Sequence, residues 1–396
     1  MALLNKFSKV TVIGILIFYI GFLLFVFPNS FRMLKLPFLG ILFLISFKDV
    51  LKIEKVVVFS LLASFLVTFI YILKGLPISQ NPTEAFNQVL TVYVLTPIMW
   101  VCILKYIFEK YPIKTIFKFL NIFMVFGALS VFVAYQLYET KQLRLLEYII
   151  DNPNMNQTQD GLVEMKLFVY GSLIFFIPGF LQIDKFYTNK KYYYLVLIIL
   201  LLASIISGRS ALLLSVFLGV LFYMFVNKFT KIIKYFFLGI FILLAVNYIL
   251  TFFGINLSNI FLEFYTKLFE GGDRARTEQT KALIEGINQN IFGAGHGVGV
   301  DYIRSNKYPW RYENVPFALI YKVSFLGFFI YSIPYFYSVY KYLKISKKSF
   351  YDNYMLIAST SMIIATFTNP YLESFEFNIF YVLPFIYFVK RDKLIS

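Results

Sequence analysis

Two arginines past the middle of the chain have the spacing and chemistry of an anion site. Arg274 and Arg276 follow two glycines and open a helical pattern that reaches about Asn290. The start of a helix favours anions over cations, so arginines there make sense if an anion docks at that end. At 100° per residue, Arg276 shares a face with Leu283 and Ile287. We therefore expect Arg276 to point toward the protein and Arg274 roughly away from it; the alternative is a solvated pair of loop charges.

A third arginine, Arg209, lies in a Ser-Gly-Arg-Ser turn between two short apolar stretches. Lys191 and Lys228 bracket this hairpin. Each leg is about 27–29 Å long at 1.5 Å per residue, which barely crosses a hydrocarbon core of about 30 Å. Arg209 is thus expected at or just below the membrane boundary, where it either binds a ligand or extends to lipid phosphates.

Glycines alternate along residues 293–299 and surround His296, the one histidine of the sequence. Such glycines let the backbone turn sharply or approach a ligand closely. A phosphate-binding loop would need a preceding strand and a Lys-Ser or Lys-Thr pair, and both are missing. The pattern favours a structural turn. His296 is either incidental or a group that titrates near neutral pH as a base or phosphate ligand.

Glu313 and Asn314 come just before an apolar stretch that contains Lys322. A lysine about two turns into a membrane span requires a carboxylate or a polar cavity. The candidate partners for Lys322 are Glu313, Glu373 and Glu376.

These residues belong to a very apolar chain. Of its 396 residues, 59% are hydrophobic and 15% are charged, and the mean hydropathy is +0.73. Soluble domains are near half apolar and a quarter charged. The composition excludes a soluble enzyme, a disordered chain and a disulfide scaffold. One cysteine and one histidine argue against a metal site rich in either residue.

The apolar stretches predict an all-α polytopic membrane protein of about twelve transmembrane helices. The whole chain, 1–396, is expected to be a single membrane domain, with a large loop at about 254–316 that carries short helices. The predicted spans are roughly 10–27, 33–47, 56–73, 86–104, 119–138, 167–183, 192–206, 211–226, 232–253, 317–340, 354–367 and 375–389.

Basic residues concentrate in every second connection, for example around 105–118 and 341–348. By the positive-inside rule these connections are cytoplasmic, as are both termini. The acidic connection 139–166 and the long loop 254–316 then lie outside. The formal charge of +16 is therefore read as a topology signal and not as nucleic-acid binding. Because long loops are usually functional, function is expected on the outer face.

Taken together, the motifs resemble those of the bacterial O-antigen polymerase and O-antigen ligase superfamily. Residues 207–210 resemble the small-residue–arginine turn of that family. Arg276, the helix after it and the run 290–295 resemble the arginine, helix and glycine run of the large outer loop. Residues 368–370 match a frequent turn near the C-terminus.

The entry into the next span carries the rest of the resemblance. Asn314 and Gly327 match the family pattern, whereas Glu313, Lys322 and Ser324 replace its histidine, glutamate and glycine. That histidine is typical of ligases, so the resemblance favours a polymerase.

The resemblance implies a multi-pass protein of the bacterial cytoplasmic (inner) membrane whose active site faces the periplasm or exterior. The reaction would be inverting transfer between undecaprenyl-pyrophosphate-linked oligosaccharides in O-antigen or related surface polysaccharide synthesis, with no cofactor and no metal. Membrane lipids and a chain-length regulator protein would be its partners, and nucleic acid would not.

Roles for the candidate residues follow from this chemistry. Arginine is a permanently charged, bidentate donor for phosphate, so Arg209 and Arg276 are assigned to the pyrophosphate and Arg274 to a supporting role. Glu313 is the first candidate for a general base and His296 the second. Two further residues are supporting: Asn314 and Lys322.

Three alternatives stay open. One is a ligase that moves finished glycan onto a lipid A core. The second is a flippase or transporter of lipid-linked glycans, which should carry charges along a central cavity, whereas the predicted spans are nearly free of charge. The third is a structural or wall-synthesis membrane protein, for which Asp273 or Glu278 would be the essential outer acid.

Overall fold

The computed structural model describes residues 2–28, 30–48, 53–140, 155–157, 163–165, 171–183, 187, 190–207, 210–226, 274–303 and 305–395, with isolated positions within 241–251.

Apolar helices dominate the described part of the chain. Four of them are long and apolar enough to cross a membrane: Lys55–Ile78, Pro82–Lys110, Ile113–Leu137 and Val315–Lys344. Shorter apolar helices cover Val12–Val26, Met33–Phe47, Gly171–Phe180 and Ala211–Val226. The chain thus has the helices of a multi-pass membrane protein. The expected total of twelve spans and their sidedness stay predictions.

Within the described residues, each expected apolar stretch except 232–253 overlaps a helix. The stretch 232–253 lies largely outside those residues. One element was not expected: the short strands β1 (Met155–Gln157) and β2 (Val163–Met165) pair antiparallel inside the acidic connection, with Asn156 opposite Glu164.

The chain divides into two compact units, each assembled from separate segments: 1–45, 112–265 and 349–361 in the first, and 46–111, 266–348 and 362–396 in the second. The helices of the first unit are α1 (Ala2–Val26), α2 (Arg32–Phe47), α6 (Ile113–Glu139), α8 (Gly171–Phe180), α9 (Lys190–Ile206), α10 (Ser210–Val226) and most of α16 (Phe350–Ala365).

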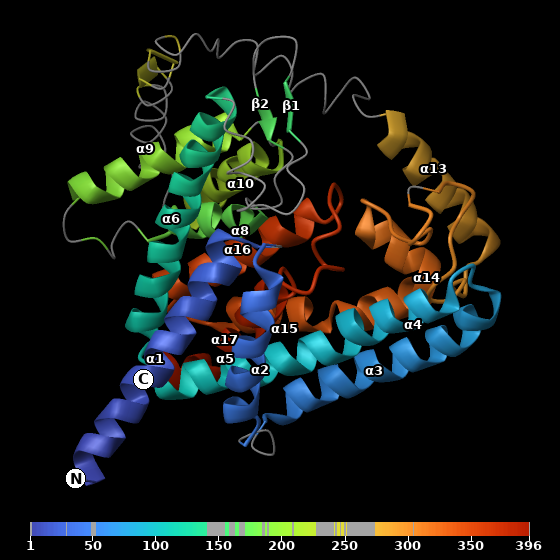
Figure 1. Cartoon of the computed structure of the whole chain (residues 1–396), viewed down its shortest axis with the longest axis horizontal. Coiled ribbons are helices and arrows are strands. Elements are labelled where there is room, and N and C mark those ends of the chain that lie inside the picture. The colour runs from blue at the N-terminus through green and yellow to red at the C-terminus, as the bar shows by residue number, and fades with distance from the viewer. Residues whose placement is uncertain are drawn as a thin grey trace. The chain divides into compact units, whose positions relative to one another are not determined.

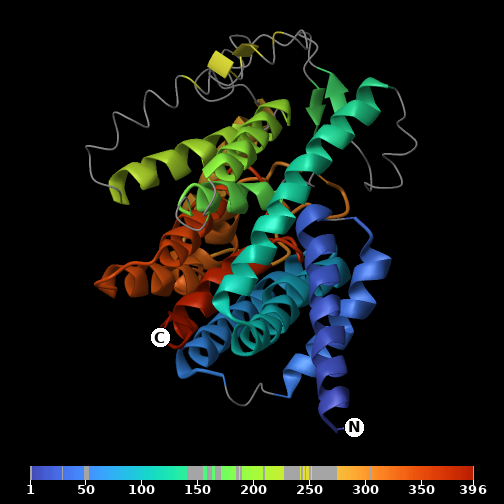
Figure 2. The same cartoon turned by 90° about the vertical axis from the view of Figure 1, so that its left-hand side faces the viewer.

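Helix α6 organises the first unit, because it packs against α1, α8 and α9 (Figure 2). Every residue of α8 is buried. Tyr354 of α16 lies edge-on to Phe117, with ring centroids 5.0 Å apart. A Cβ at Gly179 would come within 2.7 Å of the same tyrosine ring, so Gly179 allows α8 and α16 to approach closely.

The second unit carries nearly all the described candidate residues. Its elements are α3 (Lys55–Gly75), η2 (Leu76–Ile78), α4 (Pro82–Val89), the π-helical stretch η3 (Leu90–Leu95), α5 (Thr96–Lys110), α13 (Arg274–Gln289), α14 (Val315–Tyr331), α15 (Ile333–Lys344) and α17 (Ile379–Ile395). Helix α14 packs against α3 and α13, and α17 packs against α5 and α15 (Figure 1).

Helix α3 has two distinct faces. Val57, Val67 and Ile72 are buried in the protein. The opposite stripe is apolar and exposed, and it includes Phe59, Leu62, Leu66, Phe69, Ile70 and Leu73. An apolar stripe without protein cover on a span-length helix is suited to lipid contact. The helix ends at Gly75, just before Pro77 of the short η2 turn.

Two helices are irregular next to the candidate site. The π-helical stretch η3 precedes Pro97, which has no N–H to donate to the preceding turn, and the Thr96 hydroxyl donates to the Thr91 carbonyl over 2.6 Å. Helix α14 is broken at Ser324, where φ is 65° and ψ is 173°. A short π-helical stretch within an α-helix often marks a functional position. The break in α14 leaves backbone groups without partners inside the helix, and a neighbouring segment must satisfy them.

The two ends of the second unit carry different connections. At the start of α3, Lys390 of α17 forms ion pairs with Glu54 and Glu109. At the other end of α3, Gly75 lies against the backbone of His296. Glu54 and Lys390, from connections assigned to the cytoplasm, thus lie at one end of α3, and His296, from the loop assigned to the outside, lies at the other. The sidedness itself stays a prediction.

Candidate functional site

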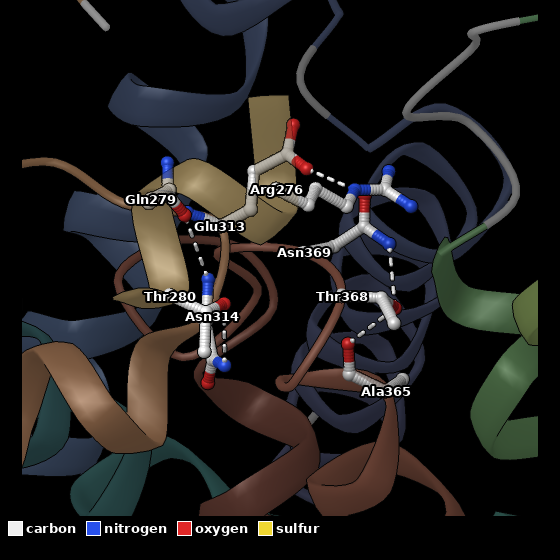
Figure 3. A network of polar contacts seen from close by, with 8 residues as sticks. All are labelled: Arg276, Gln279, Thr280, Glu313, Asn314, Ala365, Thr368 and Asn369. Atoms are coloured by element: carbon white, nitrogen blue, oxygen red, sulfur yellow. Dashed lines mark hydrogen bonds and ion pairs between the residues drawn. The ribbon is translucent and has the colours of Figure 1, made fainter. Parts of the chain in front are cut away.

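Arg276 lies in the first turn of α13 and pairs with the carboxylate that precedes α14. Its Nε donates a hydrogen bond to Oε2 of Glu313 (Figure 3). The side chains are 42% and 16% exposed, so the ion pair is at a surface that a ligand can reach. Leu283 is buried and Ile287 packs beside it, which agrees with the face expected from helical periodicity.

Gln279 holds this arrangement together, although no role was predicted for it from the sequence. Its side chain is 2% exposed, and its Oε1 accepts the backbone N–H groups of Glu313, at 2.8 Å, and Asn314, at 3.3 Å. A side-chain amide oxygen has two lone pairs and can accept both. The sequence feature that could have predicted this role is the position of Gln279 three residues after Arg276, on the same face of the helix.

Asn314 sits at the start of α14 and contacts α13. Its Nδ2 donates to Oγ1 of Thr280 over 3.4 Å, while its Oδ1 is buried without a partner among the described residues. The nearby turn after α16 also appears in Figure 3: Asn369 donates to Thr368 Oγ1, which donates to the Ala365 carbonyl. The turn expected at residues 368–370 is therefore present.

The glycine run after α13 is a structural turn. Gly293, Gly295 and Gly297 have φ values of 75°, 107° and 84°, a region that residues with a side chain rarely adopt. A Cβ at Gly295 would lie 2.5 Å from Cα of Gly75. The turn therefore fits closely against the end of α3.

Backbone hydrogen bonds dock this turn into the break of α14. The N–H groups of Ala294 and Gly295 donate to the carbonyls of Tyr321 and Lys322, and the N–H of His296 donates to the Tyr71 carbonyl. The carbonyls of Tyr321 and Lys322 directly precede the break at Ser324, so they need partners from outside the helix. The glycine turn supplies them.

His296 is buried within the protein, which contradicts the alternative in which it titrates near neutral pH and agrees with the one in which it is incidental to the chemistry. Its side chain is 1% exposed, its Nε2 lies 3.0 Å from the Tyr331 hydroxyl, and its ring centroid is 4.9 Å from that of Tyr93. Burial, reinforced by the charge of Lys322, lowers the pKa of His296 to about 3. A neutral, enclosed imidazole of this kind is a poor general base.

Lys322 is paired with Glu373, one of its three expected partners. The Lys322 Nζ and the Glu373 Oε1 are 2.6 Å apart, and both side chains are almost fully buried. The Tyr93 hydroxyl donates to the same oxygen over 2.7 Å. Burial would raise the pKa of Glu373, but the charge and hydrogen bond of Lys322 outweigh it, so the pKa lies below its usual value.

The structure sorts the described candidates into two groups. Arg276, Glu313 and Asn314 meet where α13 and α14 begin, whereas His296 and Lys322 lie in the buried group around the break of α14. Arg274 is the first residue of α13, and its side chain is outside what the structure describes. Arg209 and Asp273 are also outside the described residues.

The first group has the chemistry of an anion-handling site. A partly exposed guanidinium provides bidentate donors for a phosphate, and the adjacent carboxylate can accept a proton. Within the described ranges, no cluster of three or more histidine, cysteine or acidic residues is placed to hold a metal ion.

Comparisons with known proteins found no matching family model, no matching curated protein and no matching solved structure.

Proposed function

We propose that this chain is a membrane glycosyltransferase that joins polyprenyl-pyrophosphate-linked oligosaccharides into a polysaccharide. The observation that carries the proposal is the Arg276–Glu313 pair at the start of α13 and α14. It sets a cation for a diphosphate beside a carboxylate, next to apolar helices of membrane-spanning length. This combination suits a substrate with a long apolar tail and a diphosphate head.

The proposed reaction divides the chemistry between the two side chains. The acceptor hydroxyl attacks the anomeric carbon of the donor sugar from the face opposite the pyrophosphate, and Glu313 takes the hydroxyl proton. The bond between the anomeric carbon and the pyrophosphate oxygen breaks with inversion. Arg276, with Arg274 and Arg209 in support, stabilises the negative charge that develops on the leaving pyrophosphate.

The remaining residues hold the reacting pair. Gln279 fixes the backbone that carries Glu313, and Asn314 ties the start of α14 to α13. Lys322, paired with Glu373, supports the site through the fold. His296 leaves the list of base candidates because it is buried and neutral.

A direct experiment uses the lipid-linked oligosaccharide that accumulates in a strain without this chain. Purified protein in lipid nanodiscs is incubated with that extract, and the products are sized. The proposal expects multi-repeat chains still attached to lipid, with activity lost in Glu313→Gln. Transfer only to an added lipid A core acceptor would identify a ligase instead.

A transporter of lipid-linked glycans is the second candidate, because helix α14 is broken at Ser324 and a buried ion pair lies beside the break. Discontinuous helices of this kind form the sites of many transporters. Movement of the extracted lipid-linked oligosaccharide across liposomes without any change in its size would favour this reading.

A further inference from the structure

The turn between α13 and the glycine run exposes two apolar side chains. Ile291 is 63% exposed and Phe292 is 81% exposed. The next residue, Gly293, is fixed against the protein, since a Cβ there would lie 2.7 Å from both the Ser324 nitrogen and the Tyr71 ring. The backbone of this turn is therefore anchored while its apolar tip points away from the core.

The turn lies at the end of a span-length helix. Lys74, in the last turn of α3, donates to the carbonyls of Phe292 and Gly293. Lys74 is one turn after Ile70 and next to Leu73, which are 51% and 59% exposed. The exposed pair Ile291–Phe292 thus continues the apolar stripe of α3.

The lengths of two helices indicate that the end of α3, where this turn lies, is at a membrane boundary. Helix α3 has 21 residues, about 31 Å at 1.5 Å per residue, which matches a hydrocarbon core of about 30 Å. The helical segment from Ser324 to Lys344 gives the same length. The two segments end at the same level, because Gly293 contacts Ser324 while its neighbours contact Gly75.

The surroundings have the composition of a bilayer interface. Tyrosine and lysine are typical at that depth, and Tyr71 and Lys74 occupy it here. Ile78 of the adjoining η2 turn is 66% exposed. An aqueous setting would leave this cluster of large apolar groups in water, whereas the acyl-chain boundary of a bilayer accommodates them.

We propose that Ile291 and Phe292 form a lipid-inserting turn that enters the interfacial region of the bilayer at the end of α3. The occupant of this apolar surface is membrane lipid. Because the turn directly follows α13 (Arg274–Gln289), its insertion would fix the C-terminal end of that helix at the membrane surface.

Site-directed fluorescence tests the proposal, because the one native cysteine, Cys102, is buried and can be replaced by serine. In that background, Phe292→Cys and, separately, Ile291→Cys are labelled with an environment-sensitive dye in phosphatidylcholine–phosphatidylglycerol liposomes. Leu66→Cys on the exposed stripe of α3 is the lipid control. Glu278→Cys, exposed on α13, is the water control.

The proposal expects a blue-shifted emission at residues 291 and 292. It also expects stronger quenching by lipids spin-labelled near the headgroup than by mid-chain-labelled lipids, together with protection from aqueous iodide. Leu66→Cys should show the opposite depth preference. Iodide quenching at both turn positions equal to that at Glu278→Cys, without lipid quenching, overturns the proposal. This test does not use enzyme activity, so it stands apart from the proposed function.

Discussion

At the residue scale, the ion pair between Lys322 and Glu373 is almost fully buried. Lys322→Met leaves the Glu373 carboxylate buried without its cation, which typically costs about 3–5 kcal/mol of unfolding free energy. Combining it with Glu373→Gln removes both charges and should recover much of that loss. The free energies of unfolding of the wild type, the single variants and the double variant, measured in detergent, complete this double-mutant cycle.

The exposed pair Lys307–Glu84 supplies a matched control. Its nitrogen and oxygen are 3.7 Å apart and its side chains are 63% and 41% exposed. Removing it through Lys307→Met should change the unfolding free energy by less than about 1 kcal/mol. Equal effects of Lys322→Met and Lys307→Met would mean that the buried pair is not formed as described.

His296 makes stability depend on pH in the mildly acidic range. Its pKa is lowered from 6.5 to about 3 on folding, so between these values the unfolded chain binds a proton that the folded chain does not. The contribution of the buried, neutral imidazole to the free energy of unfolding is therefore fully present above about pH 6.5. Below that pH it declines by up to about 1.4 kcal/mol per pH unit.

Comparing the wild type with His296→Gln between pH 6.5 and 4.5 isolates this effect, because every other titratable group is common to the two proteins. The wild type should lose more stability on acidification than the variant. Parallel pH profiles would contradict a neutral, buried imidazole.

At the element scale, the glycine turn packs closely against the end of α3. A Cβ at Gly75 would lie 2.2 Å from the His296 carbonyl, and backbone cannot yield as a flexible side chain does. Gly75→Ala should destabilise the protein by about 1–3 kcal/mol or more. Gly40→Ala in α2 meets nothing within 4 Å and should be neutral or slightly stabilising. Thermal unfolding compares the two.

Periodicity and composition predicted the local elements well. The helix from Arg274 to about Asn290, its buried face and the apolar helices follow from residue patterns alone. The break at Ser324 and the role of Gln279 do not, because both depend on a distant segment. Ser324 resembles any polar residue in an apolar run until the turn at 293–295 is seen to bind the carbonyls that the break exposes.

The candidate site was predicted only in part for the same reason. Sequence reasoning selected Glu313 and Arg276 from their positions at helix starts, but it could not show that they pair with each other. It also treated His296 as available for chemistry, since exposure is not encoded in the residue type. Burial by Tyr93 and Tyr331, from two other segments, decides that question.

At the scale of the whole molecule, the separation of connections in the second unit predicts its sidedness. Asn306 and Lys347 lie in connections of opposite sets. In a cysteine-less background, Asn306→Cys should react with a membrane-impermeant maleimide added to intact cells, and Lys347→Cys should react only after the cells are opened. The reversed pattern would refute the predicted orientation and place Arg276 on the cytoplasmic side.

Arg276 and Glu313 are proposed to polymerise lipid-linked glycans. The most direct measurement is a glycan ladder from cells that lack the chain and express wild type, Arg276→Ala, Arg209→Ala or the control Lys281→Gln, which changes an exposed charge of α13. The account predicts multi-repeat lipid-linked chains for wild type and Lys281→Gln. For both arginine variants it predicts single repeats, with polymer reduced by about a hundred-fold or more, at normal protein levels. Long lipid-linked chains in cells without the protein would contradict the account.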